Sequence, residues 1–171
     1  DNIIKSYEIN AHDIELIEVL TFEKAVNLGN HLDPKNEAQA QFSIPFCLAV
    51  TALMGTKALR PLDQSCIGQQ TVIDMAKKVI IKNNSSLEKM FPAKAPAIVK
   101  VKHTHGLEEQ LVDAAFGDPT NPMSQTDLQE KFLVFSKNNL SKKRAYSIIK
   151  MVQDIPKMLK EKPSKKFDLL R

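Results

Sequence analysis

Two histidines at alternate positions, His103 and His105, are the first group in the chain that could do chemistry. Residues i and i+2 of a β-strand face the same side, so two imidazoles at this spacing could converge on a metal ion such as zinc. The next residue is Gly106, however, and a His-Gly pair between two strand-like segments indicates a hairpin turn. We therefore expect two exposed turn histidines and no metal site.

The other polar groups do not form a catalytic pattern. Glu108 and Glu109 are adjacent, so on a strand they point to opposite faces and make a poor acid–base pair. His31 and Asp33 share one turn and could touch, although local turn hydrogen bonding explains them equally well. The sequence has no glycine-rich phosphate loop and no Ser-His-Asp order with a nucleophile elbow. The residues alone support only a soluble α+β domain, in which the chemistry is not visible.

Length and composition agree with one soluble domain. The chain has 171 residues, of which 43% are hydrophobic and 26% are charged. Its most apolar stretch, residues 42–54, includes Ser43, Pro45 and Thr51 and is shorter than the ~18 residues of a membrane-spanning helix. Cys47 and Cys66 have no CxxC spacing, so we expect free thiols in a reducing compartment, with a disulfide as the alternative.

Basic charge is confined to the end of the chain. Residues 137–171 contain 11 basic and 3 acidic residues (11 − 3 = +8), whereas the other 136 contain 13 basic and 17 acidic (13 − 17 = −4). The lysines fall on the polar side of an amphipathic pattern, which favours a solvated helix face over an acidic partner or nucleic acid. We expect no nucleic-acid partner, and the last ten residues are polar enough to be disordered.

Apolar periodicity predicts the elements that position these groups. Alternating or β-branched segments predict strands, and a His-Gly turn joins the last two. Segments with helical spacing predict four helices. Pro45 should kink the helix predicted over residues 36–54 or delay the start of its regular part. Pro156 should interrupt the helix predicted from Ser141. The predicted strands are 13–22, 78–82, 97–102 and 107–116, and the predicted helices are 36–54, 69–78, one from Ser124 with a Ser-x-x-Asp capping box, and one from Ser141.

This order of elements favours an α+β fold. Strands and helices alternate irregularly and include a hairpin, so we expect a small mixed sheet with helices packed on one face, in a two-layer sandwich. A C-terminal helical tail follows. The segment 85–96 contains two prolines and is predicted to be a loop.

Two segments of the chain resemble a known enzyme family. Residues 38–55 (AQAQFSIPFCLAVTALMG) and 117–132 (GDPTNPMSQTDLQEKF) are similar to the carboxy-terminal part of the MmgE/PrpD family, which includes 2-methylcitrate dehydratase and cis-aconitate decarboxylase. The similarity extends from about residue 9 to residue 135, and its landmarks occur in the order that the family has. The Gly-x-Pro-x-Asn-Pro loop followed by Ser is the most specific of them.

The resemblance implies a fold and a place in a larger enzyme. The family combines a large all-helical domain with a smaller α+β domain that covers the active site as a lid. Residues 1–122 would be the lid, and residues 123–171 would be helices that return toward the helical domain. Because the chain begins with Asp1 and not with Met, we expect a fragment whose helical partner is upstream or on a separate subunit.

The resemblance also implies a reaction class. Family members dehydrate, decarboxylate or epimerise small polycarboxylates without a metal or organic cofactor, and they are often homodimers. Their acid–base residues lie mostly in the helical domain, so no catalytic residue can be named in this chain. The expected compartment is the cytoplasm, or the mitochondrial matrix in a eukaryote.

Ser43 and Phe46 are the substrate-binding residues that the resemblance implies. Phe46 occupies a position where the family usually has a tyrosine whose hydroxyl points to the substrate. A phenyl ring fills space but cannot donate a proton. Either another residue supplies the proton, or the chemistry is altered or lost. The hypotheses are therefore a 2-methylcitrate dehydratase-like lyase, a decarboxylase or epimerase, and a non-catalytic pseudoenzyme or subunit.

Overall fold

The computed structural model describes residues 1–158 and divides the chain into two compact units, residues 1–122 and 123–171. Each unit is described by itself. The last ten residues, where we expected disorder, lie outside the described residues. Whether the two units are a lid and a pair of returning helices stays a prediction.

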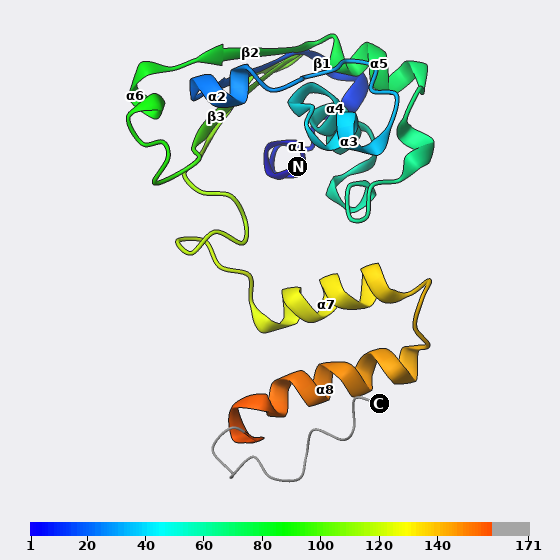
Figure 1. Cartoon of the computed structure of the whole chain (residues 1–171). Coiled ribbons are helices and arrows are strands. Elements are labelled where there is room, and N and C mark those ends of the chain that lie inside the picture. The colour runs from blue at the N-terminus through cyan, green and yellow to red at the C-terminus, as the bar shows by residue number, and fades with distance from the viewer. Residues whose placement is uncertain (159–171) are drawn as a thin grey trace. The chain divides into compact units, whose positions relative to one another are not determined.

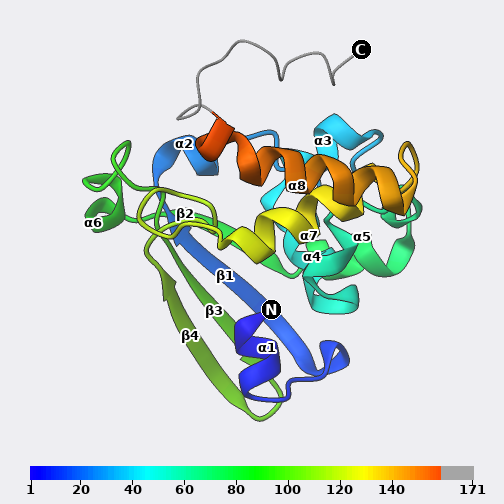
Figure 2. The ribbon, with the colours of Figure 1, turned by 90° about the horizontal axis from the view of Figure 1, so that it is seen from below.

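A four-stranded mixed sheet forms the centre of the first unit, with the strand order β2-β1-β3-β4 (Figures 1 and 2). β1 is parallel to β2 and antiparallel to β3, and β4 is antiparallel to β3. In β1 alternate residues are buried from Ile17 to Thr21, and Ile14 is buried at its start. A bulge lies between Ile14 and Leu16. The strands are β1 (Ile14–Thr21), β2 (Val79–Asn83), β3 (Ala97–His103) and β4 (Gly106–Val112).

Helices pack on one face of this sheet, which confirms the α+β fold (Figure 1). The core lies between the inner face of the strands, represented by Ile17 and Val101, and the helices α4 (Ile44–Met54) and α5 (Gln70–Ala76). Phe46, Val50 and Val72 are fully buried there. The short helices of this unit are α1 (Asn2–Ser6), α2 (Glu23–Val26), α3 (Glu37–Gln41) and α6 (Ser85–Glu88), with 3-10 turns at Ala11–Asp13, Thr56–Ala58 and Gln64–Cys66.

The helix predicted over residues 36–54 is divided into two. α3 ends at Gln41, and α4 begins at Ile44 with Ser43 as its N-cap and Pro45 in its first turn. Proline has no backbone N–H and is therefore tolerated in a first turn but not in a helix interior. The expectation that Pro45 delays the regular helix is confirmed.

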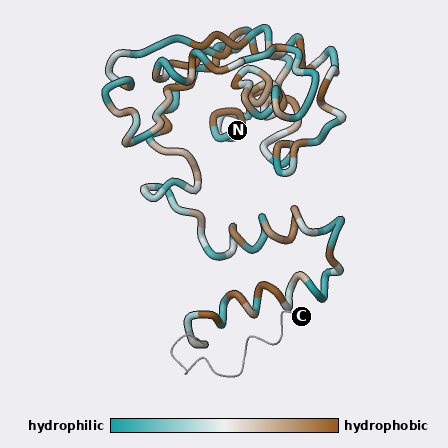
Figure 3. Tube along the Cα trace, viewed as in Figure 1, coloured by the Kyte–Doolittle hydropathy of each residue, from teal (hydrophilic) through white to brown (hydrophobic). Residues whose placement is uncertain are grey.

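The second unit consists of two helices, α7 (Gln125–Ser136) and α8 (Lys142–Met158). The predicted capping box is present, because Ser124 Oγ accepts a bond from Asp127 N and the Asp127 carboxylate accepts one from Ser124 N. Hydrophobic stretches recur along both helices (Figure 3). No described residue of α7 is buried, and in α8 only Ala145 is buried among the described side chains.

Three boundary predictions were wrong. The segment 85–96 is not all loop, because Asn84 caps the short helix α6. The last strand ends at Val112, because Asp113 and the residues after it turn away from β3. Pro156 does not interrupt α8, which is helical on both sides of this proline as far as Met158, the last described residue.

Candidate functional site

The first turn of α4 holds both residues that were predicted to bind substrate. Ser43 and Phe46 are each 1% exposed. Ser43 Oγ accepts a hydrogen bond from Phe46 N at 3.2 Å and donates one to His31 O at 2.6 Å. The serine hydroxyl therefore caps α4 and fixes the preceding loop against it, while the ring of Phe46 lies in the hydrophobic core.

Asn30 is a second anchor of this turn, which sequence reasoning missed. Its backbone has a positive φ of 42°. Its Oδ1 accepts a bond from Ile44 N at 3.0 Å, and its Nδ2 donates to Ala25 O at 3.1 Å and Val26 O at 3.0 Å. One side chain thus connects the end of α2 to the beginning of α4. The signal that could have found it is the Gly-Asn pair at 29–30, because asparagine tolerates positive φ better than other non-glycine residues.

The N–H groups at the beginning of α4 are occupied. Ile44 N donates to Asn30, Phe46 N to Ser43 Oγ, and Cys47 N to Ser43 O at 3.0 Å. Pro45 has no N–H to offer. A helix amino end binds anions through unsatisfied N–H groups. This turn can therefore position the Phe46 ring, but its backbone does not present a ready anion site.

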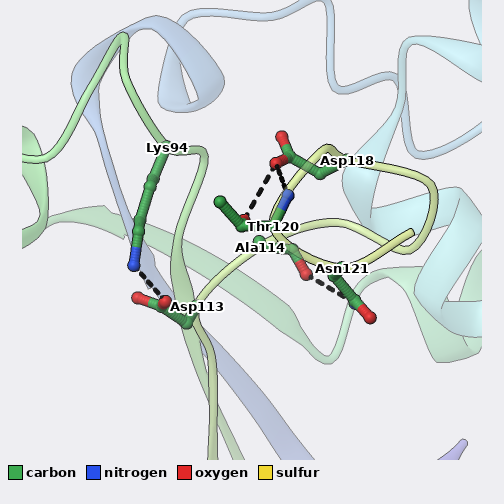
Figure 4. A network of polar contacts seen from close by, with 6 residues as sticks. All are labelled: Lys94, Asp113, Ala114, Asp118, Thr120 and Asn121. Carbon is green, nitrogen blue, oxygen red and sulfur yellow. Dashed lines mark hydrogen bonds and ion pairs between the residues drawn. The ribbon is translucent and has the colours of Figure 1, made fainter.

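The loop after β4 carries the second segment of interest, residues 117–121, and is held by its own polar groups (Figure 4). Asp118 Oδ1 accepts bonds from Thr120 N at 3.0 Å and Thr120 Oγ1 at 2.9 Å. These bonds hold the pKa of Asp118 below its usual range. Asn121 Nδ2 donates to Ala114 O at 3.2 Å, which closes the loop. At its start, Asp113 forms an ion pair with Lys94.

A cavity of about 360 Å³ opens beside this loop and the end of β4. Its polar lining contains three carboxamides, one hydroxyl and one carboxylate. Asp113 is its only charged residue, and none of its lining residues is a lysine, arginine or histidine. Because Asp113 is paired with Lys94 and the other polar lining groups are neutral, the cavity offers hydrogen bonds but no cationic side chain in its lining to bind a polycarboxylate. The lining residues are Asn2, Gln110, Leu111, Val112, Asp113, Ala114, Thr120 and Asn121.

The expectation that both histidines are exposed was wrong for His103. His105 is exposed, but His103 is only 9% exposed, because it shares the inner face of β3 with buried Val101. His103 Nδ1 accepts a long bond from His105 N at 3.4 Å, and His103 Nε2 is buried and has no hydrogen-bond partner among residues 1–158. The ring centroids are 6.1 Å apart. Among residues 1–158, no group of three metal-ligating side chains is present.

The other candidate groups have structural partners. Asp33 forms an ion pair with Lys35, and Glu109 forms one with Lys100 at 3.0 Å. Cys47 is half-buried and Cys66 is buried, and both are free thiols. Burial raises the pKa of each thiol, so neither is poised as a nucleophile. These residues contribute to the fold and to the charge of its surface.

Comparison with models of known protein families shows which family the chain belongs to. The family model described as the MmgE/PrpD C-terminal domain matches residues 2–157, which include both α4 and the 117–121 loop. The chain belongs to the MmgE/PrpD family. A search of curated proteins found no significant match. In the described part of this MmgE/PrpD chain, none of the helices has the length and apolar character needed to cross a membrane.

Proposed function

We propose that this chain is the lid portion of an MmgE/PrpD lyase that dehydrates 2-methylcitrate or a related polycarboxylate. The observation that carries the proposal is the family match over residues 2–157. That match spans the helix bearing Ser43 and Phe46 as well as the loop after β4. In the proposed enzyme, an all-helical domain supplies the acid–base residues, and no metal or organic cofactor takes part.

The role of this chain would be to close the active site. A lid excludes water and holds the substrate against catalytic groups on the opposite domain. The rigid first turn of α4 supports this role, because Ser43 and Asn30 fix the helix start from two sides. A well-fixed turn can hold the Phe46 position in one geometry when the lid meets its partner.

A helical partner is supported by the second unit. α7 and α8 expose large apolar side chains that neither helix covers. Such side chains are typical of a surface that another protein element covers. The proposal assigns this surface to the helical domain, either in the same polypeptide or on a separate subunit. The exposed residues are Leu128, Val134, Phe135, Tyr146, Val152 and Ile155.

A reducing compartment fits the proposal. Cys47 and Cys66 are free thiols, which agrees with the cytoplasm, or with the mitochondrial matrix if the source is a eukaryote. The predicted homodimer of the family would be compatible with either location.

A non-catalytic role is the second candidate, and Phe46 favours it. The residue has no hydroxyl, and its ring is buried in the core, so it offers packing and no proton. A pseudoenzyme or accessory subunit would retain the lid fold and lack the tyrosine hydroxyl that the family usually has at position 46. A decarboxylase or epimerase of the same family is the third candidate, which differs from the dehydratase in its substrate, in the bond that changes and therefore in its product.

The deciding experiment assays the chain together with a helical MmgE/PrpD domain, joined in one polypeptide or mixed as two subunits. Formation of the dehydrated product from 2-methylcitrate supports the dehydratase. Release of carbon dioxide from an unsaturated tricarboxylate supports a decarboxylase, and inversion of a stereocentre supports an epimerase. Absence of turnover with all three substrate types supports the non-catalytic candidate.

Two variants test the missing hydroxyl. Phe46→Tyr restores the group that the family usually has, and Phe42→Tyr is the matched control at a position that is 61% exposed. If the hydroxyl limits turnover, Phe46→Tyr increases kcat by about tenfold or more and Phe42→Tyr leaves it unchanged. Equal, measurable rates for Phe46→Tyr and the unaltered enzyme would show that another residue supplies the proton, whereas no turnover in either would support the non-catalytic candidate.

A further inference from the structure

His103, at the end of β3, is a buried titratable group to which the proposed lyase chemistry gives no role. Its side chain is only 9% exposed and lies on the inner face of the sheet, opposite Gly106. His103 Nδ1 accepts a bond from the His105 amide at 3.4 Å, so the proton of the neutral imidazole is on Nε2. Nε2 has no hydrogen-bond partner among residues 1–158. A buried donor without a partner costs free energy and marks a group that could change its state.

A carboxylate lies across an open space from this donor. A Cβ atom placed on Gly106 would be 3.9 Å from His103 Nε2 and 4.0 Å from Glu108 Oε1. Because Gly106 has no side chain, the imidazole and the carboxylate border the same gap. Glu108 is half-buried and lies opposite Val101, on the same face of the sheet as His103. Its carboxylate forms no hydrogen bond or ion pair within residues 1–158.

The nearest charged groups on the neighbouring strands have other partners. On β1, Glu15 is paired with Lys102 at 2.8 Å. The bond from Lys102 holds the pKa of Glu15 below its usual range, and positive charge on His103 contributes less. Just before β2, Lys78 Nζ donates to Ile14 O at 2.6 Å, beside the pair of Ile14 and His103, and its charge opposes a second cation there. The other titratable groups on the elements around this end of the sheet are Asp1, Lys5, His12, Asp13 and His105.

We propose that His103 makes the turn between β3 and β4 sensitive to pH: the turn is closed while the imidazole is neutral and opens when the imidazole is protonated. The added proton binds to Nδ1, which changes from an acceptor to a donor. Nδ1 and the His105 amide are then both donors, so the bond between them is lost. The imidazolium gains a charge-assisted hydrogen bond by moving into the gap toward Glu108, the carboxylate without a partner.

The opening affects one end of the sheet. In the same turn, the Thr104 amide donates to Asp13 O at 3.1 Å and fastens the segment before β1 to the hairpin. The bulge between Ile14 and Leu16 lies at this end of β1 as well. Opening the turn should therefore loosen the hairpin tip and this attachment, while the hydrophobic core between the strands, α4 and α5 keeps its packing. Acid would change the local shape of the hairpin without unfolding the domain.

The first test follows the turn in the full chain by NMR. At about pH 8, the ¹⁵N shifts of His103 should place the proton of the neutral ring on Nε2. As the pH falls to about 5, the protection factor of the residue 105 amide, which is corrected for the intrinsic pH dependence of exchange, should fall by about threefold or more. The fall should coincide with protonation of His103. His103→Gln should remove this pH dependence, and His105→Gln should keep it, because only an exposed side chain changes.

The second test uses the two adjacent glutamates of β4. Glu108→Gln removes the negative charge that faces the imidazole, so the midpoint of the opening should move to lower pH by about half a unit or more. Glu109→Gln is the matched control and should leave the midpoint unchanged, because Glu109 is on the opposite face and is paired with Lys100 at 3.0 Å.

Three results would each overturn the proposal. The first is a neutral His103 that carries its proton on Nδ1, since Nδ1 could then not accept the bond from the residue 105 amide. The second is equal protection of that amide at both ends of the pH range. The third is an equal shift of the midpoint in Glu108→Gln and Glu109→Gln, because the effect would then come from net charge and not from the group that faces His103.

Discussion

Ser43 is the residue on which the start of α4 depends. Its hydroxyl caps the helix through Phe46 N and also donates a partly buried hydrogen bond to His31 O. Ser43→Ala removes both bonds, so we expect a loss of about 2 kcal/mol in the free energy of unfolding. Asn36→Ala removes one exposed cap of α3 and should cost only about 0.5–1 kcal/mol. Urea denaturation measures both, and equal losses would contradict this role for Ser43.

Single residues also show where sequence reasoning fails. The motif around Phe46 could be recognised from residue order, but its burial could not, because the core that surrounds it comes from distant strands. The turn at residues 104–105 was predicted correctly in place, yet the exposure of His103 was not. Periodicity can assign a residue to one face of a strand. It cannot show that Thr104 N bonds to Asp13 O, a contact that brings the segment before β1 to the end of β3. No local pattern contains that contact.

At the scale of elements, ion pairs between strands make the sheet sensitive to acid. Glu18 pairs with Lys82 at 2.5 Å and Glu15 with Lys102 at 2.8 Å, and the hydrogen bonds from these lysines hold the pKa of each glutamate below its usual range. A depressed carboxyl pKa stabilises the fold above the ordinary glutamate value of about 4.3, and this stability is lost as the pH falls through the depressed pKa.

The test compares Glu18→Gln with the unaltered chain by urea denaturation from about pH 6 to about pH 3. We expect the unaltered chain to be the more stable at the upper end and the difference to shrink at the lower end. Glu15 is exposed and Glu18 is half-buried at the surface of the sheet, so the effect should be small and should weaken in high salt. Glu8→Gln, at an exposed position, is the control and should show no such convergence.

The strands were predicted well because alternation with period two is a local signal. All four were located, and the errors lie at their ends, where Asp113 begins a turn. The long helix of residues 36–54 was harder to predict, because its division at Ser43 requires two bonds from Asn30 and His31 in the preceding loop. Element type therefore followed from periodicity, whereas element ends depended on capping contacts across the fold.

α7 depends on its cap more than the other helices do, because none of its described residues is buried. Ser124→Ala removes the bond to Asp127 N. We expect the free energy needed to open the first turn of α7 to fall by about 1 kcal/mol. Hydrogen exchange of the Asp127 amide should then be about fivefold faster. Ser147→Ala in α8 removes only a side-chain bond to Lys143 O and should leave that amide unchanged. An unchanged rate in Ser124→Ala would show that packing, and not the cap, holds the turn.

At the scale of the whole molecule, the two units differ in what they bury. The core cluster of the described residues extends from Ile3 to Val101 and lies within the first unit. In the second unit, α7 has 12 residues, and helices shorter than about 12–15 residues are marginal in water without packing. We therefore expect residues 1–122 alone to unfold cooperatively, and residues 123–171 alone to be only partly helical by circular dichroism, because α7 is too short to be stable without packing.

Adding a helical MmgE/PrpD domain to the isolated 123–171 segment tests whether its helices are stabilised by docking on that domain or fold by themselves. If the exposed apolar side chains of α7 and α8 are the docking surface, the segment gains helix on mixing and its apolar residues become protected. Val152→Lys, at a side chain that is 54% exposed, should abolish that gain, whereas Gln153→Lys on the polar side should not. A segment that is fully helical without a partner would show that the second unit folds by itself, and its apolar face would then have to be explained without the helical domain.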